Sequence, residues 1–241
     1  MVVWSKMHKK ISCHNFIALY SLIFDPMEIL NPITAAEVAQ KLLEIQAIRL
    51  QPEKPFTWAS GWKSPIYCDN RLSLSFPEVR NLVRDELVKS VRHFFPETEA
   101  IAGVATAGIP QGALIANELN LPFVYVRSKP KGHGMENMIE GKVTPGQKVV
   151  VVEDLVSTGG SSLKAVEDLR HAGFEVLGMV AIFSYGFEVA DQNFSNAGVK
   201  LVCLSHYDAL LPQAVASHYI NESTLKSLSE WRVNPSKWMQ E

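Results

Sequence analysis

The sequence alternates short apolar runs with amphipathic segments, and this pattern restricts the fold more than any other feature. Apolar runs bounded by turn residues predict buried strands, and they occur at 100–105, 122–126, 148–152, 175–183 and 200–204. Apolar residues at three- and four-residue steps predict helices, and they occur at 33–48, 77–95, 109–119 and 161–173. Continuous apolar strands separated by helices are typical of a parallel sheet covered on both faces. We therefore expect an α/β fold with a mostly parallel central sheet.

The composition excludes several classes of protein. The chain has 241 residues, of which 47% are hydrophobic and 20% charged, which suits one globular domain. A formal net charge of −2 argues against binding nucleic acid through a broadly basic surface. The three cysteines lack metal-binding spacing, so we expect no zinc site and a reducing, cytoplasmic location.

The first 26 residues differ in character from the rest. Basic residues followed by a short apolar run imitate a signal peptide, but no small-residue cleavage site follows and the run is too short to span a bilayer. Ordinary folded sequence begins at Met27. We therefore expect no membrane segment, an N-terminal extension over 1–26 and a single domain over 27–241.

Two junctions between a predicted strand and the next predicted helix are rich in glycine and hydroxyl groups, at 105–112 and 153–161. In parallel sheets, ligands bind at the carboxyl ends of the strands, where helix N-termini offer N–H donors. Both junctions can approach an anion closely. The second is more specific, because two acids, Glu153 and Asp154, directly follow the apolar run.

The two acids indicate which ligand the second junction binds. A phosphate on the hydroxyl and glycine turn would be repelled by the acids, so they must face another part of the ligand. Ionised carboxylates accept strong hydrogen bonds from vicinal hydroxyls, so the loop predicts a phosphorylated sugar. The chain has no P-loop and no dinucleotide-binding glycine motif. The candidate residues are Glu153, Asp154, Leu155, Val156, Ser157, Thr158, Gly159, Gly160 and Ser161.

This arrangement of apolar strand, two acids and hydroxyl and glycine turn resembles the binding loop for phosphoribosyl diphosphate (PRPP) in type I phosphoribosyltransferases. The resemblance implies a Rossmann-like fold with a small N-terminal hood and a mobile flap. It also implies that the acids hold the 2′ and 3′ hydroxyls of the ribose and that the turn holds the 5′-phosphate.

A second segment, 125–141, carries cations at alternate positions, interrupted by proline and glycine: Arg127, Lys129, Lys131 and His133. This composition disfavours a stable helix and favours a mobile, positively charged flap, and a solvated charged loop is the alternative. The segment resembles the catalytic flap of the orotate phosphoribosyltransferase family, and 56–71 resembles that family's orotate-binding segment. The resemblance extends over most of residues 30–240.

The resemblance implies a set of roles. Arg127, Lys131 and His133 are expected to reach the diphosphate of PRPP, and orotate is expected to contact Tyr67, Cys68 and Ser157. Lys131, His133 and Asp154 are the expected catalytic residues. Mg²⁺ is expected to be held mainly by the diphosphate, with no protein ligand assigned. The family also implies a homodimer in which each flap serves the neighbouring subunit.

The sequence departs from residues that some family members carry at Ala59, Thr106, Ala107 and Ser128. The segment 184–188 lacks an arginine that some members place near the base, and Lys63 and Lys129 are neighbouring cations that would compensate. Two alternatives to an orotate enzyme stay open. One is a phosphoribosyltransferase for another nucleobase, and the other is a non-catalytic regulatory protein of the same fold, which should lack a complete cationic flap.

Overall fold

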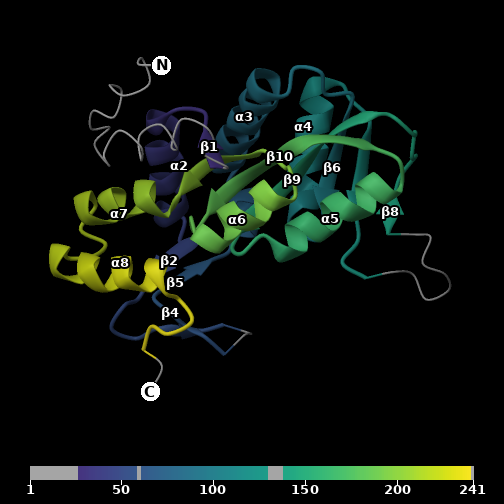
Figure 1. Ribbon diagram of the computed structural model, residues 1–241. Helices are drawn as coiled ribbons and strands as arrows, with labels where there is room; N and C mark the ends of the chain where they lie inside the picture. The colour runs from purple at the N-terminus through teal and green to yellow at the C-terminus, as the bar shows by residue number, and fades with distance from the viewer. Residues whose placement is uncertain (1–26, 59–60, 130–137, 240–241) are drawn as a thin grey trace, which may run out of the picture.

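A seven-stranded sheet forms the centre of the computed structural model, which describes residues 27–58, 61–129 and 138–239 (Figure 1). The strand order is β1-β11-β10-β9-β6-β7-β8. Every neighbouring pair is parallel except β7 and β8, which are antiparallel. The expected α/β class with a mostly parallel sheet is therefore confirmed. The strands are β1 (Met27–Ile29), β6 (Ala100–Val104), β7 (Phe123–Val126), β8 (Ile139–Glu140), β9 (Lys148–Val156), β10 (Glu175–Ser184) and β11 (Leu201–His206).

Seven α-helices accompany the sheet in the described part of the chain: α2 (Pro32–Glu44), α3 (Pro77–Phe94), α4 (Gly108–Leu119), α5 (Gly160–His171), α6 (Glu188–Asn196), α7 (Tyr207–Ala216) and α8 (Leu225–Val233). The four predicted helices are present, but the first was predicted too long. It ends at Glu44, Gln46 adopts a left-handed φ of 58°, and Ile48 already begins a strand. Of the apolar residues after Glu44, Ile45 and Ala47 therefore lie in the turn that follows α2, and Ile48 begins the strand. None of the described helices is long and apolar enough to cross a membrane.

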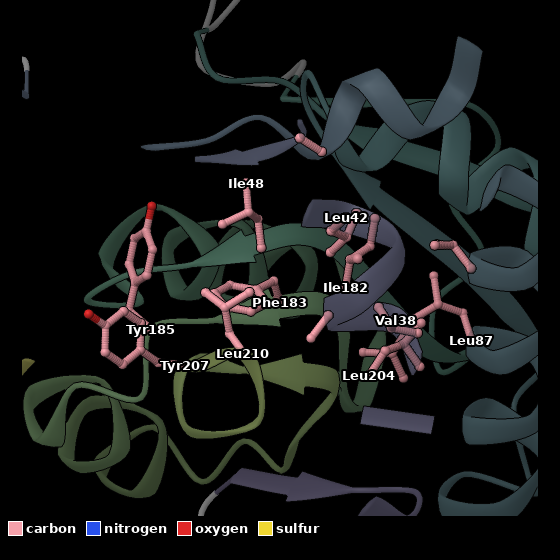
Figure 2. Close-up of a cluster of buried hydrophobic side chains, with 14 of the residues drawn as sticks. Val38, Leu42, Ile48, Leu87, Ile182, Phe183, Tyr185, Leu204, Tyr207 and Leu210 are labelled. Carbon is pink, nitrogen blue, oxygen red and sulfur yellow. The ribbon is translucent and has the colours of Figure 1, made fainter. Parts of the chain in front are cut away.

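Alternate residues of the central strand β9 point into two separate hydrophobic clusters. Val150 and Val152 belong to the larger cluster, which packs against α2, α3, α4 and α7 on one face of the sheet. Figure 2 shows part of this cluster, including Ile182 of β10 and Leu204 of β11. Val149 and Val151 pack with α5 and α6 on the other face. This two-residue alternation is inherent in a β-strand, so it also decides where side chains at the end of β9 point.

A small substructure lies beside the carboxyl ends of the central strands (Figure 1). It contains two antiparallel pairs, β2 (Ile48–Leu50) with β5 (Ile66–Cys68) and β3 (Phe56–Thr57) with β4 (Lys63–Ser64), followed by the 3-10 helix η1 (Asn70–Ser75). A short 3-10 helix η2 (Glu222–Thr224) precedes α8. Trp231 of α8 is fully buried, and its ring lies 5.8 Å from Trp58 and 5.6 Å from Tyr185. The C-terminal helix therefore packs the substructure against the end of β10.

Two glycines near the start of α4, Gly108 and Gly112, let the helix lie directly against the sheet. A Cβ at Gly108 would overlap the carbonyl oxygen of Val152, and one at Gly112 would lie 2.7 Å from the ring of Phe123. A Cβ at Gly103 of β6 would lie 2.8 Å from the carbonyl oxygen of Gly108. This close approach fixes the loop between β6 and α4 next to the end of β9.

Candidate functional site

The two acids of the predicted binding loop lie within β9, which continues to Val156 instead of ending before Glu153. Strand alternation therefore sends their side chains to opposite faces of the sheet. Glu153 turns toward α5 and is only 6% exposed. Its Oε2 accepts a hydrogen bond from the Ser162 hydroxyl at 3.0 Å, and its Oε1 accepts one from the Asp154 backbone N–H at 3.0 Å. Asp154 turns the other way, toward η1, and is partly exposed.

The electrostatics of the acids follow from this burial. Burial, together with the charge of Asp154, raises the pKa of Glu153 to about 8. A proton on Glu153 is therefore retained near neutral pH. Burial also raises the pKa of Asp154, while hydrogen bonding with Glu153 and with nearby backbone N–H groups, and to a smaller extent the Arg71 guanidinium, oppose that rise. Asp154 is thus the acid that is placed to accept hydrogen bonds from a ligand, and Glu153 supports its backbone.

The turn after β9 has the geometry of an anion site. Gly159 adopts a φ of 81°, and a Cβ there would lie 2.7 Å from the ring of Phe194, so both conformation and space require glycine. Gly160 begins α5, so the N–H groups of residues 159–161 lie at the positive end of a helix. Ser157, Thr158 and Ser161 all retain solvent exposure. The predicted phosphate-binding turn is therefore assembled at the edge of the sheet.

The other predicted junction lies beside it. The Ala105 N–H donates to the carbonyl oxygen of Val126 at 2.8 Å, and α4 begins three residues later at Gly108. The peptide bond between Ala105 and Thr106 is cis. Strands β6 and β9 are neighbours in the sheet, so the two junctions are brought together at one edge.

The predicted orotate-binding segment reaches the same edge through Asn70, whose side-chain amide donates to the backbone oxygen of Asp154 at 2.6 Å. Cys68 is close by, with its thiol 3.3 Å from Asn70 Oδ1. Tyr67 lies on the opposite face of β5, where the Arg49 guanidinium is 4.8 Å from its ring centroid. Of the two neighbouring residues predicted to contact orotate, Cys68 is therefore on the side of Asp154 and Tyr67 points away from it.

Contacts between Arg127 and residues 138–140 join the two ends of the predicted flap. The Arg127 N–H donates to the Met138 oxygen at 2.7 Å, and its guanidinium pairs with Glu140 of β8 at 3.0 Å. Lys129 is exposed. The other two predicted flap cations, Lys131 and His133, lie outside the described residues, as does Ala59.

Three residues of the site had no predicted role: Asn70, Ser162 and Asn193. The valine run could have signalled the contact between Glu153 and Ser162. Its two-residue period places Glu153 on the same face of β9 as Val149 and Val151, which pack against α5. No comparable pattern signals Asn70 or Asn193, because each contacts the loop only through the tertiary fold, across 84 and 35 residues of sequence respectively.

Within residues 27–58, 61–129 and 138–239, no group of three or more His, Cys, Asp or Glu side chains is arranged to hold a metal. Asp154 offers one partly exposed carboxylate at the ligand-binding edge. Mg²⁺ commonly binds through one or two carboxylates together with the phosphates of a substrate. The donor set therefore fits an Mg²⁺ ion that a phosphorylated ligand brings with it.

Comparisons with known proteins agree with this geometry. Residues 75–200, just over half of the chain, match the family described as phosphoribosyl transferase domain. An orotate phosphoribosyltransferase of Cytophaga hutchinsonii is 65% identical over 202 residues, which cover 84% of this chain and 97% of the relative.

Solved structures give the same result. The orotate phosphoribosyltransferase of Aeropyrum pernix matches with a TM-score of 0.67 and 30% identity, over 76% of this chain and 99% of that one. A UMP synthase of Leishmania donovani matches with a TM-score of 0.68 and 32% identity, over 82% of this chain and 42% of that one. The family match over half of the chain, the 65% identity over nearly the whole relative and the shared fold show that the chain belongs to the orotate phosphoribosyltransferases of the phosphoribosyltransferase family.

Proposed function

We propose that the chain transfers the phosphoribosyl group of PRPP to orotate, giving orotidine 5′-monophosphate and diphosphate, as a step of UMP biosynthesis. The observation that carries the proposal is the convergence of three segments at one sheet edge. The turn at 157–161, the junction at 105–112 and the end of β5 all lie around Asp154. One pocket for a phosphoribosyl group, a diphosphate and a base requires these three components together.

The ribose 5-phosphate half of the donor would bind along the loop after β9. The turn offers N–H groups and hydroxyls to the 5′-phosphate, since residues 159–161 begin α5. Asp154 accepts hydrogen bonds from the ribose hydroxyls, and Glu153 supports it from the α5 side through the Asp154 N–H. Orotate would lie beside Cys68 and Ser157.

The chemistry places opposite charges on the two products. Breaking the anomeric C–O bond builds positive charge on the ribose and negative charge on the departing diphosphate. Lys131 and His133 are the proposed catalytic cations, and protonated His133 would also donate a proton to the leaving group. Mg²⁺ bound to the diphosphate supplies further positive charge there. Arg127 would contribute only after leaving Glu140, with which it pairs at 3.0 Å.

We also infer that the enzyme is a cytoplasmic homodimer in which the flap segment 125–141 serves the active site of the neighbouring subunit. Closure would exclude water that hydrolyses the donor. The support is the cationic composition of this segment and its resemblance to the family's flap.

The substrate is tested with purified protein, Mg²⁺ and PRPP. Orotate should be consumed, seen as loss of its ultraviolet absorbance, while adenine, hypoxanthine and uracil at the same concentration stay unchanged. Turnover of a purine at a comparable rate would contradict the proposed specificity. A protein that binds PRPP but turns over no base would instead be the regulatory alternative.

The shared flap is tested by mixing two inactive variants, Lys131→Ala and Asp154→Ala. In a mixed dimer, one site collects both substitutions and the other receives an intact flap and an intact loop. Random pairing makes about half of the dimers mixed, so activity should return to roughly a quarter of wild type. If both residues serve their own subunit, mixing restores nothing. A mass tag on one variant confirms that subunits exchanged.

A further inference from the structure

Asn70 connects two parts of the site that are distant in sequence. It is the first residue of η1, only 1% exposed, and lies two residues after Cys68, the last residue of β5. Its side-chain N–H donates to the backbone oxygen of Asp154 at 2.6 Å. The hydrogen bond acts on the residue whose carboxylate we assign to the ribose hydroxyls, so the position of Asn70 sets the position of that carboxylate.

The other polar atoms of Asn70 extend the connection in two directions. Its Oδ1 accepts a hydrogen bond from the Cys68 thiol at 3.3 Å. Its backbone oxygen accepts one from the Ser73 hydroxyl at 2.6 Å, and Ser73 in turn accepts one from the Gln111 amide at 3.4 Å. Gln111 is buried in the first turn of α4, within the junction at 105–112. Asn70 therefore joins the predicted orotate-binding segment to the loop after β9 through its side chain, and to the junction at 105–112 through its backbone oxygen and Ser73.

The far end of the ribose loop is held separately. Asn193 of α6 donates its side-chain N–H to the backbone oxygen of Thr158 at 2.9 Å. The loop is thus fixed by one asparagine amide at Asp154 and by another at Thr158. The contacts of Asn70 extend to Cys68, whereas Asn193 is on the opposite face of the sheet with α5 and α6. This difference provides a matched control.

We propose that Asn70 is a positioning residue that orients Asp154 against the ribose of PRPP and ties that orientation to the orotate subsite. The proposal rests on the proposed function for the identity of the two ligands. A buried amide that only stabilised the fold would leave the affinity for PRPP unchanged once the protein is folded. A positioning residue must change that affinity when its donor is removed.

Asn70→Asp tests the donor without changing the shape of the side chain. The new carboxyl can donate to the Asp154 oxygen when protonated, and it repels that oxygen when ionised. Burial and the charge of Asp154 should raise its pKa toward neutral. The dissociation constant of PRPP with Mg²⁺, measured by calorimetry without orotate, should therefore be near wild type at about pH 6 and roughly tenfold weaker at about pH 9.

Ionisation of PRPP changes the dissociation constants of both proteins alike. The result is therefore expressed as the ratio of the variant's dissociation constant to that of wild type at each pH. A ratio that does not rise with pH overturns the proposal. Orotate plays no part in this measurement, so failure of wild type to turn over orotate would count against the proposed function and not against the role of Asn70.

The link to the base is tested with Asn70→Leu and Asn193→Leu, after near-ultraviolet circular dichroism confirms that each is folded. Asn70→Leu should raise the KM values of both PRPP and orotate severalfold. Asn193→Leu should raise only that of PRPP. If the Asn70 variants do not fold, Ser73→Ala takes their place, because it removes a support of Asn70 and should also raise both KM values. An unchanged KM for orotate in the folded variant would overturn the link.

Discussion

Replacing Glu153 with glutamine should make the protein more stable at alkaline pH. Glu153 is 6% exposed, and both of its oxygens are engaged by Ser162 and by the Asp154 N–H. Burial and the charge of Asp154 raise its pKa from 4.5 to about 8. Glutamine has the same shape, can accept the hydrogen bond from the Asp154 N–H and can donate a hydrogen bond to the Ser162 hydroxyl. It therefore imitates the protonated acid.

The sign of the effect follows from proton binding. Below pH 4.5 Glu153 is protonated in both the folded and the unfolded chain. Between 4.5 and about 8 only the folded protein holds the proton, so the free energy of unfolding falls as the pH rises. At about 1.4 kcal/mol for each pKa unit, the loss from this group is roughly 3–5 kcal/mol. A glutamine at this position does not titrate and should avoid that loss.

The measurement is urea denaturation of wild type and Glu153→Gln from about pH 5 to pH 8.5, followed by tryptophan fluorescence. The difference in the free energy of unfolding between the two proteins should grow in favour of glutamine across this range. Glu97→Gln is a control at an exposed site, where the ion pair with Lys148 lowers the pKa of Glu97, so its difference should be small and of opposite sign. Parallel pH profiles for wild type and Glu153→Gln would refute the assignment of a buried, protonated acid.

Two further predictions concern the fold. Gly108→Ala should lower the free energy of unfolding by roughly 2–4 kcal/mol, because its Cβ would overlap the Val152 oxygen. Gly146→Ala, at an open site with a φ of 78°, should lower it by about 1 kcal/mol. Equal losses of the two variants in urea denaturation would contradict the close-packing argument. A chain that starts at Met27 retains all of β1 and should keep its activity and melting temperature, and a large loss of either in thermal and kinetic assays would show that residues 1–26 contribute to the domain.

Much of the site was predictable because strand and loop chemistry are local. The valine run followed by acids, hydroxyls and glycines predicts a sugar-phosphate loop from residue types alone. The structure confirms a strand, a turn and a helix there, and Gly159 has the left-handed φ that the turn requires. The roles of Lys131 and His133 stay predictions. The small strands β2 to β5 were not predicted, because segments of two or three residues carry too little periodicity to be recognised.

Short-range patterns of apolar residues were enough to predict the α/β class and five of the seven strands of the central sheet, and the structure confirms both. The chemistry of the loop after β9 stays a prediction. Long-range packing was needed to show that Glu153 is buried and Asp154 partly exposed, because that depends on how far β9 continues and on what packs against each face. The same is true of the contact between Asn70 and Asp154. A hydrogen bond between residues 84 positions apart exists only when the sheet and the small substructure pack together.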